Sequence, residues 1–93
     1  MFLHLGNDHI VFNKDIIAVL DFETTTVSKI TREFLKVSEE EGFIINVSED
    51  VPKSFIVTDS GGQSKIYISN IASSTLLKRL ESGTPGGIKY EWN

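Results

Sequence analysis

Two histidines and two aspartates near the N-terminus are the residues whose types first invite a chemical interpretation. Imidazole nitrogens and carboxylate oxygens are ligands that zinc and similar metals accept. The four residues are His4, Asp8, His9 and Asp15. Their spacing matches no ligand motif, and a histidine at a strand edge beside turn carboxylates is an ordinary structural arrangement. We therefore expect no metal site here.

Carboxylates offer a second kind of chemistry, because a pair of them can act as general acid and base. Asp21 lies two residues before Glu23, and a run of three glutamates occupies residues 39–41. The run falls near the C-terminal end of an expected helix, where the helix dipole disfavours negative charge. A solvated helix face explains the run better than a catalytic site does.

Other catalytic motifs are missing from the sequence. The chain has no cysteine, which excludes disulfides, thiolate metal sites and a cysteine nucleophile. Neither histidine stands in a recognisable relation to a serine nucleophile motif. Residues 59–62 lack the Gly-Lys-Ser/Thr sequence of a phosphate-binding loop and predict a hairpin turn. We expect a protein that is not an enzyme and uses no cofactor.

The basic residues are candidates for contacts with nucleic acid. Lys14 and Lys53 lie in predicted turns beside strand ends, and Lys78 and Arg79 are neighbours on a predicted short helix. The net charge of −4 opposes binding through bulk attraction to phosphate. A symmetric oligomer would repeat these small groups as a basic track. These four residues are the candidate DNA contacts.

Hydrophobic periodicity predicts the elements that position these residues. Strands are expected at 2–5, 10–12, 16–22, 43–47, 54–58 and 65–68. Gly6-Asn7-Asp8 predicts a tight turn between the first two strands. The predicted fold class is α+β, a small mostly antiparallel sheet of about six strands with one long and one short helix.

Two segments change to a helical period. Residues 27–42 predict the long helix, with Thr26 or Ser28 as its N-cap and Gly42 as the left-handed residue after its end. The short helix begins after a capping Ser73 or Ser74 and extends to about residue 80.

A chain of 93 residues is enough for one domain. We assign residues 1–82 to this domain and residues 83–93 to a Gly/Pro linker and C-terminal tail. The tail alternates through Tyr90 and Trp92, so an extra strand is one interpretation of it. The N-terminus resembles neither a signal peptide nor a membrane span. A cytoplasmic protein without a membrane partner is expected.

Strands that are apolar on both faces predict that the chain associates with itself. The runs 16–20 and 43–45 leave no polar face, and two short helices offer limited cover for six strands. A domain of this size is also marginally stable alone. A helix on each face, or a sheet curled on itself, is the alternative. The candidate interface residues are Ile17, Val19, Ile44, Tyr90 and Trp92.

Four segments together resemble the bacterial extracellular-matrix regulator family (RemA and RemB), on its RemB side. They are residues 3–8, 14–21, 52–58 and 73–79, in the same order and at nearly the same spacing. The resemblance covers residues 1 to about 80. It implies a regulator of biofilm-matrix gene expression and, for the RemA branch, a DNA-binding protein whose subunits close into rings.

The basic residues of the RemA branch are only partly matched. That branch has an arginine where this chain has Asp15, and an arginine-rich turn where this chain has residues 49–53. Lys14 and Lys53 retain positive charge near those places. Two functions remain open: a DNA-associated transcriptional regulator, or a protein-interaction module that does not bind DNA and acts through homo-oligomerisation or partner binding.

Overall fold

The computed structural model describes residues 1–82 of the chain, which form six strands, three α-helices and one short 3-10 helix. The elements are β1 (Phe2–Gly6), β2 (His9–Phe12), the 3-10 helix η1 (Asn13–Asp15), β3 (Ile16–Asp21), α1 (Phe22–Thr25), α2 (Lys29–Glu40), β4 (Ile44–Asn46), β5 (Ser54–Ser60), β6 (Gln63–Ser69) and α3 (Ser73–Ser82). The predicted α+β class is confirmed, with α1 as an additional short helix.

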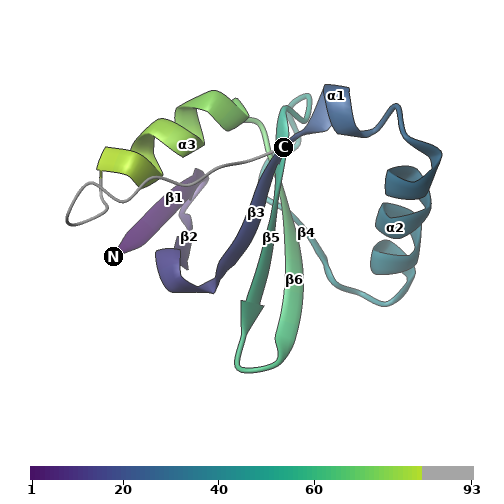
Figure 1. Cartoon of the computed structure of the whole chain (residues 1–93), viewed down its shortest axis with the longest axis horizontal. Helices are drawn as coiled ribbons and strands as arrows, with labels where there is room; N and C mark the ends of the chain where they lie inside the picture. The colour runs from purple at the N-terminus through teal and green to yellow at the C-terminus, as the bar shows by residue number, and fades with distance from the viewer. Residues whose placement is uncertain (83–93) are drawn as a thin grey trace.

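The six strands form two sheets. β1 and β2 make an antiparallel hairpin, and the other four make a sheet of order β3-β5-β6-β4. Pairing in the larger sheet is antiparallel except between β4 and β6, which run parallel. In Figure 1 the four-stranded sheet stands at the centre, with the hairpin and α3 on one side and α2 on the other.

Both predicted tight turns are confirmed by backbone conformation. Asn7 and Asp8 have φ of 44° and 66°, and Gly61 and Gly62 have φ of 59° and 87°. Two successive left-handed residues give the turn whose twist matches that of paired strands. The local sequence therefore sets the register of both hairpins.

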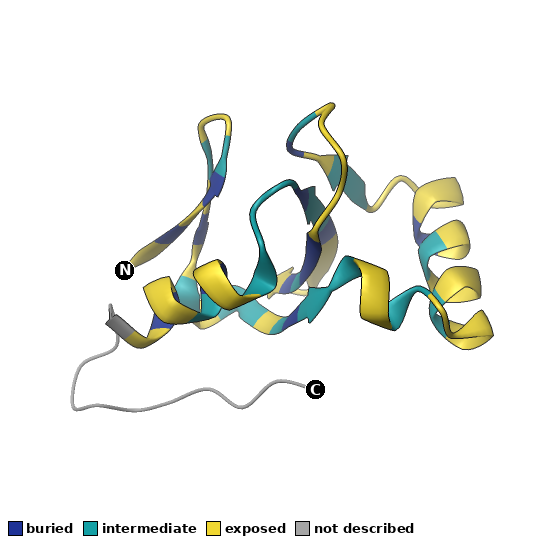
Figure 2. Cartoon of the chain, turned by 90° about the horizontal axis from the view of Figure 1, so that it is seen from above, coloured by how far each residue is buried: buried dark blue, intermediate teal, exposed yellow. Residues whose placement is uncertain are grey.

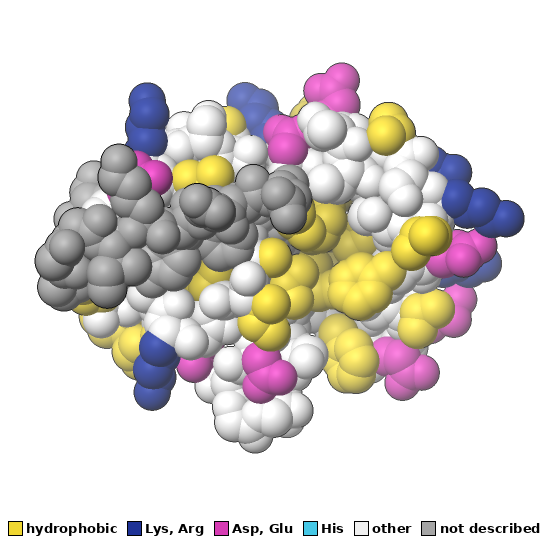
Figure 3. Space-filling view, in the orientation of Figure 1, with side chains coloured by type: hydrophobic (Ala, Val, Ile, Leu, Met, Phe, Trp, Pro, Cys, Tyr) yellow, Lys and Arg dark blue, Asp and Glu magenta, His cyan; other side chains and the backbone are white. Residues whose placement is uncertain are grey.

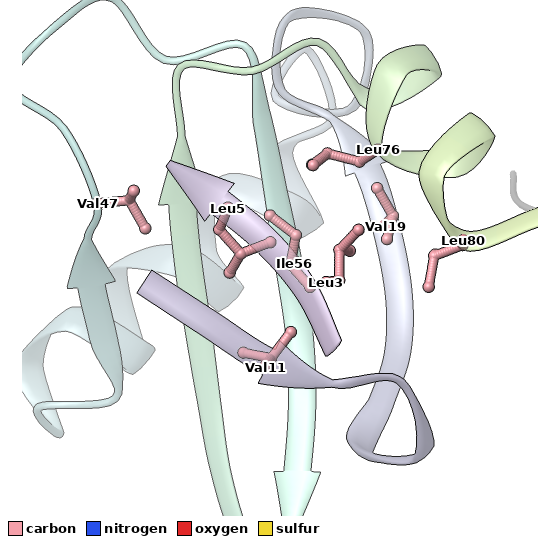
Figure 4. Close-up of a cluster of buried hydrophobic side chains, with 8 residues drawn as sticks. All are labelled: Leu3, Leu5, Val11, Val19, Val47, Ile56, Leu76 and Leu80. Carbon is pink, nitrogen blue, oxygen red and sulfur yellow. The ribbon is translucent and has the colours of Figure 1, made fainter. Parts of the chain in front are cut away.

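One face of the four-stranded sheet carries the core. The inner side of the β1–β2 hairpin packs on this face, and α3 closes it from the side of β3 (Figure 4). The core residues are Leu3, Leu5, Val11, Val19, Val47, Ile56, Leu76 and Leu80. The hairpin thus provides, from within the chain, much of the cover that the two-faced strands require.

Two side-chain hydrogen bonds fasten the hairpin to the rest of the fold. Ser69 Oγ donates a hydrogen bond of 2.7 Å to the carbonyl oxygen of Leu5, and the side-chain amide of Asn7 donates one of 2.9 Å to the carbonyl oxygen of Val47. Ser69 is 1% exposed, so its hydroxyl has little access to water. These bonds satisfy groups that would otherwise be costly to bury.

Helix α1 interrupts a segment that was predicted to remain extended as far as Phe22. The carboxylate of Asp21 accepts a 2.8 Å hydrogen bond from the amide of Thr24 and so caps the helix. The hydroxyl of Thr25 donates to the carbonyl of Asp21, and that of Thr26 donates to the carbonyl of Phe22. Local capping therefore overrides the low helix propensity of three consecutive threonines.

The cap predicts a pH dependence of stability. Hydrogen bonds from Thr24, chiefly from its backbone amide, hold the pKa of Asp21 below its ordinary value. A lowered folded-state pKa gives stability that is fully present above about pH 4 and is lost as the pH falls through that pKa. Asn caps helices well but does not titrate. The difference in unfolding midpoint between wild type and Asp21→Asn should therefore shrink below about pH 4; a constant difference would contradict this assignment.

Candidate interaction surfaces

Helix α2 has well-defined ends. Ser28 caps the first turn by accepting a hydrogen bond from the amide of Thr31. At the other end Gly42 has φ of 79°, its amide donates to the carbonyl of Glu39, and the amide of Phe43 donates to the carbonyl of Ser38. This pair of bonds is the Schellman ending that a glycine favours. The predicted long helix, its Ser28 cap and its Gly42 end are confirmed.

The apolar side of α2 is largely exposed. Val27, which precedes the Ser28 cap, is 76% exposed, and Ile30, Phe34 and Val37 on the helix itself are 80%, 48% and 55% exposed. The side of the helix toward the sheet holds the half-buried Leu35 and the buried Ser38. Figure 2 shows α2 as a mostly exposed element at one end of the molecule. An apolar helix side this exposed is unusual for a protein that works as a monomer.

A groove runs between α2 and the adjacent face of the sheet. Its volume is about 350 Å³, and its apolar lining includes Phe34, Val37, Phe43, Val57 and Ile66. In Figure 3 apolar side chains gather between the sheet and α2, with acidic side chains along the α2 side. We call the exposed apolar side of α2 together with this groove the helix surface. Its composition fits the apolar core of a protein–protein interface.

The outer side of the β1–β2 hairpin is a second exposed apolar surface, which we call the hairpin surface. Phe2 pairs with Phe12 across the two strands, and their ring centroids are 5.0 Å apart. Phe2, Ile10 and Phe12 are 60%, 46% and 48% exposed, and Met1 is 63% exposed. Lys14 lies over the ring of Phe12, at 5.8 Å from its centroid.

The residues predicted to lie at an interface between chains differ in how far they are buried within the protomer. Ile17 is 58% exposed, whereas Ile44 is half-buried and lines a groove with Leu35. Val19 is 1% exposed inside the core, because the hairpin and α3 cover its face of β3. Its assignment to an interface between chains is therefore wrong. Tyr90 and Trp92 lie outside the described residues.

The candidate DNA contacts do not form one cluster in the protomer. Lys14 precedes β3 and Lys53 precedes β5, and these strands are antiparallel, so the two lysines lie at opposite ends of the sheet. Lys78 and Arg79 lie on α3, and Arg79 Nη1 donates a 3.3 Å hydrogen bond to the carbonyl of His4. A continuous basic track needs more than one chain.

The residues first considered for metal binding remain apart. Within residues 1–82, no three His, Cys, Asp or Glu side chains gather as a metal site requires. His9 Nδ1 lies 3.1 Å from the carbonyl oxygen of Asn7, as part of the turn.

None of the helices in this part of the chain has the length and apolarity that crossing a membrane demands.

The fold and these surfaces define a small α+β domain that presents two exposed apolar surfaces and dispersed cations. The chain belongs to the RemA-like family, described as "Extracellular matrix regulatory protein A-like", whose sequence profile matches residues 2–80. Extracellular matrix regulatory protein B of Bacillus subtilis (strain 168) is 37% identical over 81 residues, which are 87% of this chain and 91% of that protein. The resemblance to this family, on its RemB side, is confirmed.

Sequence reasoning missed the apolar residues of α2 as candidates for an interface between chains. The signal was present, since Val27, Ile30, Phe34 and Val37 define one apolar side in the sequence. Periodicity identifies such a side but does not show whether the rest of the chain covers it. Only the placement of α2 at one end of the fold reveals that it is exposed.

Proposed function

We propose that this protein regulates the expression of extracellular-matrix (biofilm) genes as a cytoplasmic homo-oligomer, without catalysing a reaction. The observation that carries the proposal is the exposed apolar side of α2 in a chain of the RemA-like family. The Bacillus subtilis relative is named as a matrix regulatory protein, which supports the same role here.

Physical chemistry supports assembly through the helix surface. Complete burial of a Val, Ile or Phe side chain contributes about 1.5–3 kcal/mol. Val27, Ile30, Phe34 and Val37 leave about half or more of this burial unrealised in the protomer. A second chain on this surface would recover much of it and stabilise a domain that is marginal alone.

DNA association is part of the proposal, with Lys14, Lys53, Lys78 and Arg79 as contacts. The oligomer would repeat the dispersed cations and build from several chains a track that one protomer lacks. Phosphate contacts of this kind are sensitive to salt, because each one releases counterions from DNA.

A double variant tests these contacts. Replacing Lys14 and Lys53 by glutamine should weaken DNA binding and reduce the slope of log affinity against log salt by about 0.9 for each phosphate that the variant no longer neutralises. Fluorescence anisotropy across a salt series measures both quantities. The matched control is Lys29→Gln with Lys36→Gln, which removes the same charge from α2. Equal weakening by the two pairs would contradict the assigned contacts.

A protein-interaction module is the second candidate function. The separation of Lys14 from Lys53 along the sheet and the net charge of −4 favour it. In this case the oligomer binds another protein, and affinity for DNA is absent even at low salt. The same anisotropy titration therefore distinguishes the two candidates.

A further inference from the structure

We infer that the C-terminal segment of this chain, residues 88–92, docks on its own domain as a strand beside β3. The segment lies outside the described residues and also beyond residues 2–80, which the RemA-like sequence profile matches. The inference goes beyond the proposed function, because it concerns a contact within one chain and holds whether or not that chain assembles or binds DNA.

The outer edge of β3 has no neighbouring strand within residues 1–82. β3 is the first strand in the order β3-β5-β6-β4, so it pairs with β5 on one side only. Backbone groups of alternate residues in such a strand point away from its single partner. An edge of this kind is a template on which a further strand can pair.

The other strand edges in this part of the chain are shorter or already occupied. β4 and β2 have three and four residues, whereas β3 has six. On β1 the carbonyl groups of His4 and Leu5 accept hydrogen bonds from the side chains of Arg79 and Ser69. β3 therefore offers the longest edge on which a further strand can pair.

Apolar side chains accompany this edge of β3. The pairing register shifts between Ile16 and Ala18, and Ile17 at this irregularity is 58% exposed. Leu20 is only half-buried, although it lies within the strand. A strand beside β3 would cover both side chains and pair with the backbone of β3 at the same time.

The chain leaves the described part of the fold close to this edge. Helix α3 packs against β3, and Figure 4 shows Leu76 and Leu80 of this helix beside Val19 of β3. The linker, residues 83–87, follows the end of α3 at Ser82 and spans at most about 17 Å. A strand of five residues then covers about 16 Å of the roughly 20 Å length of β3.

The sequence of residues 88–92 suits an edge strand. Ile88, Tyr90 and Trp92 alternate with Lys89 and Glu91. Successive side chains of a strand point to opposite faces, so a strand of this sequence has one apolar side and one charged side. The apolar side matches the exposed side chains of β3.

The attachment of the segment favours its own domain over another copy as the docking site. A short flexible linker gives an attached segment an effective concentration on the order of millimolar, which exceeds that of separate chains in a micromolar solution. Charged residues at a sheet edge also discourage pairing with further strands. The docked segment would thus close the edge of β3 to strands of other proteins.

Trp92 allows a direct test, because it is the only tryptophan of the chain. Docking predicts that native full-length protein emits at shorter wavelength than urea-unfolded protein and that acrylamide quenches its fluorescence less. Both signals should be independent of protein concentration, and both should persist in a chain that carries Ile30→Glu and Val37→Glu. Native emission and quenching equal to those of the unfolded protein would overturn the inference.

A substitution on β3 tests where the segment lies. Ile17→Lys places a charge at the exposed position on the edge and should shift the emission of Trp92 toward that of the unfolded protein. Val51→Lys is the matched control, since it makes the same charge change at a residue that is 77% exposed in the loop before β5. Circular dichroism checks that both variants fold. Unchanged emission in folded Ile17→Lys would exclude β3 as the docking site.

Substitutions in the segment test its strand character and leave residues 1–82 unaltered. Ile88→Asn with Tyr90→Asn removes most of the apolar side, and Lys89→Asn with Glu91→Asn removes the charged side. Hydrogen exchange should show protected amides in residues 88–92 of the wild type and of the second pair, and loss of protection in the first pair. Equal loss in the two pairs would contradict the alternation.

The same measurements separate this inference from the proposed function. If the Trp92 signals disappear on dilution or in the chain that carries Ile30→Glu and Val37→Glu, the segment docks on another copy and the inference is wrong. Sedimentation measures assembly independently of Trp92. A monomeric wild type with protected Trp92 would therefore overturn the proposed oligomer and leave the inference standing.

Discussion

Replacing Ile30 and Val37 by glutamate is expected to weaken assembly by at least about 100-fold while leaving the protomer folded. Both side chains are more than half exposed, so their replacement disturbs little of the packing within the chain. In the oligomer the new carboxylates would be buried against apolar groups, at a cost of several kcal/mol when no partner is present. Each 1.4 kcal/mol is a factor of about ten in the association constant. Sedimentation equilibrium measures that constant.

The matched control removes positive charge from a different side of the same helix. Lys29→Gln with Lys36→Gln changes the net charge from −4 to −6, as the glutamate pair does (−4 − 2 = −6). Lys29 forms an exposed ion pair of 4.0 Å with Glu33, which contributes little stability. We expect near wild-type assembly from the control. Equal loss of assembly in the two pairs would attribute the effect to net charge and not to the apolar side of α2.

The second large effect is expected in the core. Leu5→Ala should lower the free energy of unfolding by about 2–5 kcal/mol, because a fully buried leucine leaves a cavity when truncated. Leu5 is 0% exposed and lies between the hairpin and the sheet, so its loss also loosens the attachment of the hairpin surface. Urea unfolding should be measured in a chain that also carries Ile30→Glu and Val37→Glu, so that assembly does not contribute to stability.

Val51→Ala is the control for this measurement. Val51 is 77% exposed in the loop before β5 and belongs to neither surface. A truncation there should change the unfolding free energy by no more than about 0.5 kcal/mol. If Leu5→Ala cost as little as Val51→Ala, the hairpin would not be packed on the sheet as described.

The parts of the fold that were predictable depend on local interactions. Asn7, Asp8, Gly61 and Gly62 have left-handed conformations that their residue types favour, so both tight turns could be predicted. The ends of α2 could be predicted for the same reason, since a serine cap and a glycine ending act within one turn of the helix.

The parts that were not predictable depend on distant contacts. The six strands divide into two sheets, and β4 pairs in parallel with β6. Both features depend on which segments meet in space, and the local sequence does not determine that. Val19 illustrates the consequence for the site: its strand is apolar on both faces, and only the docking of the hairpin and α3 determines which face is covered. The apolar side of α2 is the opposite case: the sequence suggests that it is buried, but no element within residues 1–82 covers it.

We propose above that this chain acts as an assembly of identical subunits. Sedimentation equilibrium of the wild-type protein at micromolar concentration tests it most directly. We predict a mass that is a multiple of 10.4 kDa and that falls to 10.4 kDa when Ile30 and Val37 are replaced by glutamate. A wild-type protein that remains at 10.4 kDa throughout this concentration range would contradict the account.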